Sequence, residues 1–447
     1  MLSWEQRPLR ALLRLAGPIA VSMLSYSVMT LVDTLVVGRL GSAALAGVGL
    51  GGTVAFALVC FWFGLLRGTK TLVAQAIGAG RRDLVNAYHR AAVLTALVAG
   101  VFMIAVGQGA AEVLAHVAAT PAAGHAARTY LRIRNLAAPL TLLFGALREV
   151  RYGEGDARSP MLASIAANLV NVALSTTFVF ALGWGVAGVA AATAIAQSAE
   201  AAFLWLLMRN KSGWRGCAVE RAHFVALARV GLPTAVQLGL EVGAFAILTA
   251  FISSLSETQM AAHQIALQAC QFSFLPAFAI AEGAQVLAGQ AVGARRDELV
   301  ARVAWLALVT AGVYTGACSL GFALGAPLIV AGFTSSVALA AVAVRLLRVA
   351  ALFQASDGAN IVARAILRGV GDMRFAAVVG VATAWLMTPP LTWLLGAHAH
   401  LGAAGGWLGL CGESVLGSLI LWRRVRSGAW RNAGPSFVDG GAHAQAA

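Results

Sequence analysis

Residues 43–66 read AALAGVGLGGTVAFALVCFWFGLL, and none of these 24 side chains is charged. A helix needs about 20 apolar residues to cross the hydrocarbon core of a bilayer. The whole chain has the same character, because 60% of its 447 residues are hydrophobic and only 11% are charged. Soluble proteins carry about 25% charged residues. The sequence is therefore typical of an integral membrane protein.

Apolar segments of this length recur along the chain, and many of them are rich in glycine, which lets membrane helices pack closely. The composition predicts an all-α integral membrane protein with twelve transmembrane helices. The first segment is predicted to be a retained span rather than a cleaved signal peptide. The predicted spans are 11–38, 43–66, 90–110, 130–150, 160–182, 185–208, 224–254, 258–282, 301–325, 340–364, 375–396 and 403–422.

The net charge of +14 comes from Lys and Arg side chains that are dispersed between the apolar segments. No basic patch with interleaved aromatic residues is present, so nucleic acid is not an expected partner. Most basic residues, including Arg81, Arg82, Arg151 and Arg364, fall on one side if the N-terminus is cytoplasmic. By the positive-inside rule, both termini are expected in the cytoplasm and the chain in the inner membrane, in contact with lipid.

The second half of the sequence repeats the first at an offset of 215 residues. Pro18-Ile19-Ala20-Val21 aligns with Pro233-Thr234-Ala235-Val236, and with one inserted residue Gly155-Asp156 aligns with Gly371-Asp372. Six spans per copy is an even number, so both copies enter the membrane in the same orientation. Such parallel repeats are typical of transporters with a central site.

The repeat predicts two pseudo-symmetric six-helix lobes. The N-terminal lobe is predicted at residues 1–210 and the C-terminal lobe at 224–425, joined by a cytoplasmic linker at 211–223. Residues 433–447 are rich in small and polar side chains and are predicted to form a disordered tail. A cavity between two lobes of one chain requires no second subunit, so we expect a functional monomer.

Several short motifs are distributed along the chain. They are Val32-Asp33-Thr34, Gly38-Arg39-Leu40-Gly41, the segments 73–80, 263–267 and 289–293, and Leu367-Arg368-Gly369-Val370-Gly371-Asp372. Together they resemble the multidrug and toxic compound extrusion (MATE) family, in particular its NorM-like branch, over about residues 15–422. The resemblance implies two six-helix lobes around a cleft, export of small amphipathic and often cationic organic compounds, and coupling to inward sodium ions or protons, without any cofactor.

Three acidic residues inside predicted spans are candidates for cation coupling. Ionisable groups within the membrane are costly and usually face a cavity or a partner. Asp33 lies late in the first span, while Glu241 and Asp357 lie in the second lobe. By the resemblance, Glu241 and Asp357 match the acids that bind the coupling ion, so they are candidate sodium ligands. The same pair could instead take up a proton.

A structural role for these acids is the alternative, in which each acid bonds a nearby Ser, Gln or backbone group. In a related branch of the family, an Asn-rich helix carries a motif that ends with Asp. In this chain the corresponding segment, Asn168 to Leu174, is followed by Ser175. Other polar residues in spans are candidates for lining the cavity, although they could also join helices through hydrogen bonds. They are Tyr26, Asn168, Asn171, Gln264 and Gln354.

Opposite charges occupy equivalent positions in the two repeats, since Arg67 plus 215 is Glu282. Arg67 or Lys70 is a candidate to pair with Glu282 in a cytoplasmic gate when that side of the transporter is closed. The alternative is that the two basic side chains extend to the lipid headgroups. If both cations faced the cavity without partners, they would favour neutral or anionic cargo.

The sequence therefore predicts a secondary active exporter. A flippase for lipid-linked saccharides is the alternative within transport. A membrane-embedded enzyme would need a catalytic motif, such as His-Glu-x-x-His or a nucleophile elbow, and the sequence contains none.

Overall fold

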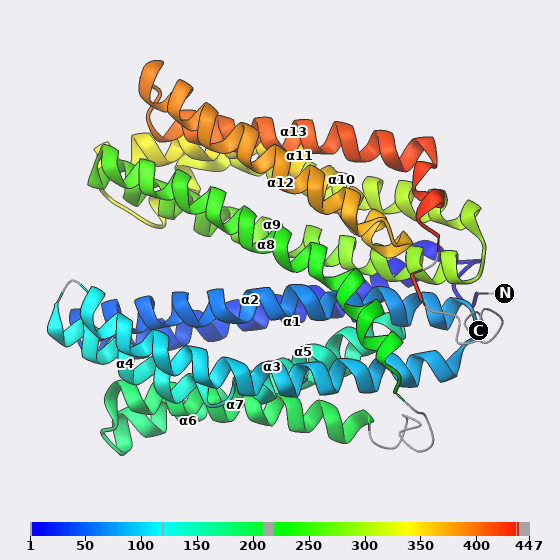
Figure 1. Cartoon of the computed structure of the whole chain (residues 1–447). Helices are drawn as coiled ribbons and strands as arrows, with labels where there is room; N and C mark the ends of the chain where they lie inside the picture. The colour runs from blue at the N-terminus through cyan, green and yellow to red at the C-terminus, as the bar shows by residue number, and fades with distance from the viewer. Residues whose placement is uncertain (1, 119, 209–218, 435, 438–447) are drawn as a thin grey trace. The chain divides into compact units, whose positions relative to one another are not determined.

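The computed structural model describes residues 2–118, 120–208, 219–434 and 436–437. Most of the predicted linker, 211–218, and most of the predicted tail, 438–447, lie outside the described residues. The described part of the chain contains helices and no β-strand, which confirms the predicted fold class (Figure 1).

The first repeat begins with three long helices, α1 (Pro8–Gly38), α2 (Ser42–Gly78) and α3 (Arg82–Val117). Two shorter helices follow, α4 (Pro121–Asn135) and α5 (Ala138–Gly153). The repeat ends with α6 (Arg158–Thr176), the π-helical segment η1 (Thr177–Ala181) and α7 (Gly185–Met208).

The second repeat has the same order. It contains α8 (Arg221–Leu255), α9 (Glu257–Gly293), α10 (Asp297–Ala331), α11 (Val337–Val370) and α12 (Met373–Leu391). The π-helical segment η2 (Thr392–His398), α13 (Ala403–Ser427) and the 3-10 helix η3 (Ala429–Ala433) follow. The two π-helical segments begin at Thr177 and Thr392, so they keep the offset of 215 residues.

Eleven helices of the described chain are long and apolar enough to cross a membrane. The predicted span at 130–150 is not a single helix, because α4 ends at Asn135 and α5 begins at Ala138. Pro139 follows this break, and proline removes a backbone donor and restricts the residue before it. Its counterpart in the second repeat, α11, has no proline inside and is continuous.

The chain divides into two compact units. Unit 1 combines Met1–Ala20 with Val236–Ser436, and unit 2 runs from Val21 to Ala235. Both divisions fall inside the first helix of a repeat, α1 or α8, two residues after Pro18 or Pro233. The predicted lobe boundaries at 210 and 224 stay a prediction.

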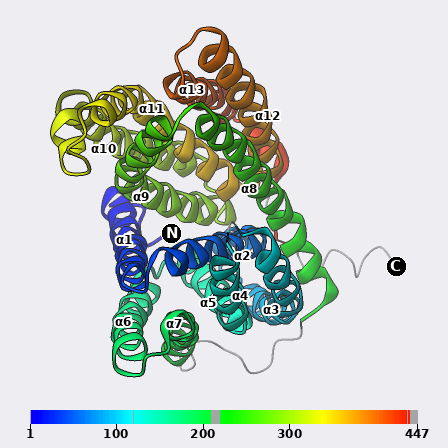
Figure 2. The same cartoon turned by 90° about the vertical axis from the view of Figure 1, so that its left-hand side faces the viewer.

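Within unit 1, α11 packs against α9, α10 and α13 (Figure 2). The start of the chain belongs to the same unit. The indole nitrogen of Trp4 donates to Gln290 at 2.8 Å, and Glu5 pairs with Arg296 at 2.7 Å. Within unit 2, α2 packs against α3, α4 and α5, and α6 lies beside α7 (Figure 1).

Candidate functional site

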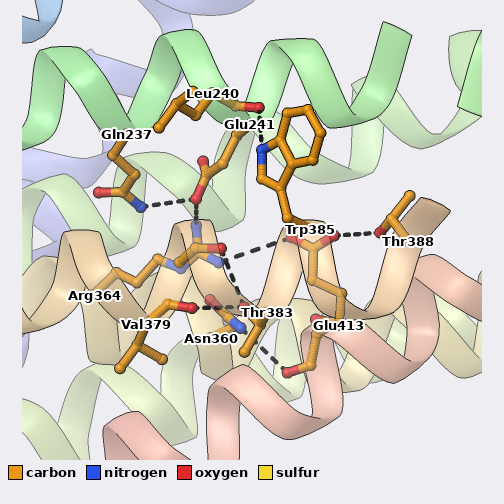
Figure 3. A network of polar contacts seen from close by, with 12 residues as sticks. Gln237, Leu240, Glu241, Asn360, Arg364, Val379, Thr383, Trp385, Thr388 and Glu413 are labelled. Carbon is orange, nitrogen blue, oxygen red and sulfur yellow. Dashed lines mark hydrogen bonds and ion pairs between the residues drawn. The ribbon is translucent and has the colours of Figure 1, made fainter. Parts of the chain in front are cut away.

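Two carboxylates of unit 1 flank one guanidinium group (Figure 3). Arg364 on α11 places Nη1 2.6 Å from Oε1 of Glu241 on α8. Its Nη2 lies 4.0 Å from Oε1 of Glu413 on α13. The three side chains are between 14% and 22% exposed, so solvent screens them only in part. Three helices that are distant in sequence thus meet through one cation.

Each of these two carboxylates is also held by a neutral donor. The amide of Gln237, one helical turn before Glu241, donates to Glu241 Oε1 at 2.8 Å. The hydroxyl of Thr388 on α12 donates to Glu413 Oε2 at 2.6 Å. Arg368 in turn donates to the amide oxygen of Gln237 at 3.1 Å. Donors of this kind fix the direction in which each carboxylate faces.

Asp357 lies on α11, seven residues before Arg364, and is partly exposed. Seven residues correspond to about two helical turns, so both residues occupy the same face of α11. Asp357 lies within electrostatic range of Arg364, Glu413 and Glu241. The predicted acids Glu241 and Asp357 therefore lie in one region of unit 1, with Arg364 bonded to Glu241.

Two residues of this region, Glu413 and Arg364, were not predicted as site residues. Arg364 was predicted only to add to the cytoplasmic charge, and in the structure its side chain is 14% exposed and bonds Glu241. Glu413 lies in an apolar span, so the criterion that selected Glu241 would also have selected it. The pairing itself joins residues 123 positions apart and has no local sequence signal.

Oxygen atoms of acids suit a hard cation such as sodium, and they can also exchange protons. In the described part of the chain, no group of three or more His, Cys, Asp or Glu side chains is arranged to hold a metal ion. The assignment of Glu241 and Asp357 as sodium ligands stays a prediction.

The third candidate acid, Asp33, belongs to unit 2 and lies in a separate polar cluster. Ser175 on α6 donates to Asp33 Oδ1 at 3.0 Å, and the hydroxyl of Thr193 on α7 lies 3.4 Å from Oδ2. The amide of Asn171 donates to Thr193 at 3.3 Å. Asp33 therefore bonds a nearby serine, as expected if its role is structural. Coupling through Asp33 stays a prediction.

The predicted lining residues have different surroundings. Gln354 is buried and donates to Ser273 at 2.6 Å, and Asn168 donates to Ser25. Tyr26 is 47% exposed and Gln264 is also exposed. Asn171 is buried beside Thr193, as described above. A role in lining a cavity stays a prediction for all five.

The predicted gate residues lie in both units. Lys70 is fully buried in unit 2, and its Nζ lies 3.5 Å from Oε2 of Glu149 on α5. Glu149 also accepts from Arg148 at 2.9 Å. Lys70 therefore does not extend to lipid headgroups. Because it has Glu149 as a partner, it is not an unpaired cation that would favour anionic cargo. Glu282 is buried in α9, and its pairing with Arg67 or Lys70 stays a prediction.

Comparison with known families gives two matches to one model. The MatE family model matches residues 18–177 and again residues 233–394. The matches begin 215 residues apart, which confirms the internal repeat.

Curated relatives match almost the whole chain. A probable multidrug resistance protein NorM from Pseudomonas syringae pv. tomato is 31% identical, over 93% of this chain and 95% of its own length. A probable multidrug resistance protein NorM from Deinococcus radiodurans is 32% identical, over 92% of this chain and 94% of its own length.

Solved structures show the same fold. A MOP superfamily transporter from Pyrococcus furiosus superposes with a TM-score of 0.88 at 24% identity, over 95% of this chain and 97% of that one. A structure of MATE in complex with MaL6 gives a TM-score of 0.89 at 24% identity with the same coverage.

Proposed function

Because the chain belongs to the MatE family, whose members are membrane transporters and not enzymes, we propose that it is a secondary active exporter of small organic molecules. Inward movement of sodium ions or protons across the inner membrane drives the export. The NorM relatives are named for multidrug resistance, which supports a range of amphipathic and cationic substrates for this chain.

The observation that carries this proposal is the polar network around Arg364. Charged groups in membrane helices are expensive to insert, and they persist where they serve ions or substrates. Glu241, Asp357 and Glu413 bring three carboxyl groups from α8, α11 and α13 to one region. A single guanidinium cannot neutralise three carboxylates, so the acids can take up further positive charge, as a sodium ion or as a proton.

The internal repeat supports transport by alternating access. Two copies of one fold in the same orientation form transporters that expose a central site to either side in turn. The candidate acids are not duplicated between the two copies, since Glu241 corresponds to Tyr26 and Asp33 to Leu248. We therefore assign cation coupling to the acids of each repeat separately.

Transport in proteoliposomes tests the proposal directly. Purified protein is reconstituted, a pH gradient or a sodium gradient is imposed, and ethidium movement is followed by fluorescence with DNA inside the vesicles. We expect one of the gradients to drive ethidium against its concentration. Glu241→Gln and Asp357→Asn should each lower the initial rate at least about tenfold, because each removes a charge from the proposed coupling site.

The matched control is Glu257→Gln, which removes an exposed carboxylate at the start of α9. It should transport at the rate of the unmodified protein. The proposal is wrong if neither gradient moves ethidium or a wider set of organic cations, or if Glu241→Gln transports as well as the control.

A further inference from the structure

Arg364 occupies the position where an ion bound by the acids of unit 1 would be expected. Its Nη1 is 2.6 Å from Glu241 and its Nη2 is 4.0 Å from Glu413, so it lies between carboxylates of two different helices. A guanidinium stays charged at every physiological pH. The positive charge at this point therefore cannot dissociate from the protein, unlike a sodium ion.

The packing around Oε1 of Glu241 leaves little room for a second cation beside Arg364. This oxygen already accepts from both Arg364 and Gln237. The backbone of α12 also approaches it, since a methyl group added at Gly380 would lie 2.6 Å from it. A sodium ion at Oε1 would have to displace one of these two donors.

The contacts of Arg364 with the acids are incomplete. Only Nη1 is at hydrogen-bond distance from a carboxylate, and the buried Nε has no hydrogen-bond partner. A guanidinium has five N–H donors, and structural arginines between acids normally use several of them. Arg364 thus places one positive charge between the acids and leaves some of its donors unused.

The first repeat offers a comparison. With the offset of 216 that aligns Gly155 with Gly371, Arg148 corresponds to Arg364. Arg148 bonds the neighbouring Glu149 at 2.9 Å and lies over the rings of Phe63 and Phe144. Its guanidinium therefore has three partners of its own, whereas that of Arg364 is directed at the candidate coupling acids.

We propose that Arg364 is a tethered counter-cation that takes the place of sodium between Glu241 and Glu413, so that this transporter is driven by protons and not by sodium. This inference rests on the proposed function, in which the acids around Arg364 are the coupling site. Arg364 is then the residue that determines ion specificity, and removing its charge opens a sodium site.

Sodium binding to purified protein tests the inference without any substrate. Thermal unfolding is followed in detergent while sodium replaces potassium at constant ionic strength. The unmodified protein should show no response specific to sodium. Arg364→Gln should gain a saturable rise in Tm of about 2 °C or more, because a ligand that binds only the folded state stabilises it.

Three further variants make the result specific. Arg148→Gln, the matched control, should gain no sodium response. Arg364→Lys keeps the charge and should also gain none. The pair Arg364→Gln with Glu241→Gln should lose the gain. A folded Arg364→Gln protein without a sodium response would overturn the inference, as would a sodium response in the unmodified protein.

Transport by the unmodified protein gives a second test that does not depend on any variant folding. A pH gradient should drive ethidium, and a sodium gradient alone should not. Export driven by sodium alone would overturn the inference and leave the proposed function intact. Absence of export under both gradients, together with a sodium response in Arg364→Gln, would overturn the proposed function while the specificity role of Arg364 stands.

Discussion

Arg295 has left-handed backbone geometry, with φ of 55°, in the turn between α9 and α10. Its counterpart at the offset of 215 is Gly80, with φ of 73°, in the turn between α2 and α3. The two turns have the same hydrogen bonds, such as Arg81 N to Ala76 O and Arg296 N to Ala291 O, both at 2.9 Å. The second repeat thus places a side chain where the first has glycine.

Arg295→Gly should therefore stabilise the protein. The left-handed conformation costs a residue with a Cβ about 1–2 kcal/mol, and part of the gain is lost to the greater freedom of glycine in the unfolded chain. We expect a net gain of about 0.5–1 kcal/mol, measured by unfolding in detergent. Gly80→Ala is the reciprocal variant and should destabilise. An equal or lower stability for Arg295→Gly would contradict the explanation.

The buried acid Glu149 has two cationic partners, Lys70 at 3.5 Å and Arg148 at 2.9 Å. Breaking a buried ion pair costs about 3–5 kcal/mol, since it leaves a buried charge uncompensated. Glu149→Gln should approach this range because it affects two cations. Lys70→Met should cost less, because Glu149 keeps Arg148. Unfolding in detergent of both variants and of the double variant measures these losses in stability. A larger loss for Lys70→Met than for Glu149→Gln would disprove the explanation.

The turn that joins α5 to α6 is organised by Asp156. It accepts from the Ser159 hydroxyl at 2.6 Å, from the Ser159 backbone at 3.0 Å and from the Arg151 guanidinium. Burial acts to raise the pKa of Asp156, but these hydrogen bonds and the charge of Arg151 outweigh it and hold the pKa below its ordinary value. The ionised form is therefore the one that stabilises the turn.

A lowered pKa in the folded state gives stability that is present above the pKa of the unfolded chain and is lost as the pH falls through the folded value. Asp156→Asn should cost about 1–2 kcal/mol at pH 7, as expected for hydrogen bonds to a charged group. The difference from the unmodified protein should shrink below about pH 4. Asp83→Asn, which alters an exposed pair with Arg81, should cost less than about 1 kcal/mol. A difference that does not change with pH would contradict the role of the charge.

At the scale of helices, apolar length predicted the order of the elements but not their ends. The helix α2 has 37 residues, or about 55 Å, and so exceeds the roughly 30 Å of hydrocarbon that sets the predicted spans. The break between α4 and α5 was missed because the apolar run that begins at Leu136 dominates the predicted span, although its α4 part carries Arg132 and Arg134. Pro139 was the available signal, but prolines are tolerated inside α1 and α8.

The acids of the candidate site could be predicted from the sequence, but their grouping could not. Glu241 and Asp357 could be selected singly, because one acid in an apolar span is visible in the sequence. Their grouping with Arg364 and Glu413 depends on how α8, α11 and α13 pack. An arginine near the end of a predicted span reads equally well as a loop charge or as a partner for an acid, and only the packing distinguishes the two.

For the whole molecule, the repeat was the most informative feature of the sequence. It predicted two copies of one fold in one orientation, and the two matches to the MatE family confirm the offset. It did not predict that the compact units divide inside α1 and α8. That division follows from contacts between Trp4 and Gln290 and between Glu5 and Arg296, which join the first residues of the chain to the second half.

These contacts impose an order on biosynthesis. Trp4 leaves the ribosome 286 residues before its partner Gln290. At about 5–20 residues per second, that interval is on the order of 15–60 s. During this time unit 2 can be inserted and packed, while the first twenty residues have no surface of their own unit to bind. The return of the first residues of the chain to the second repeat therefore waits until α9 and Arg296 have been made.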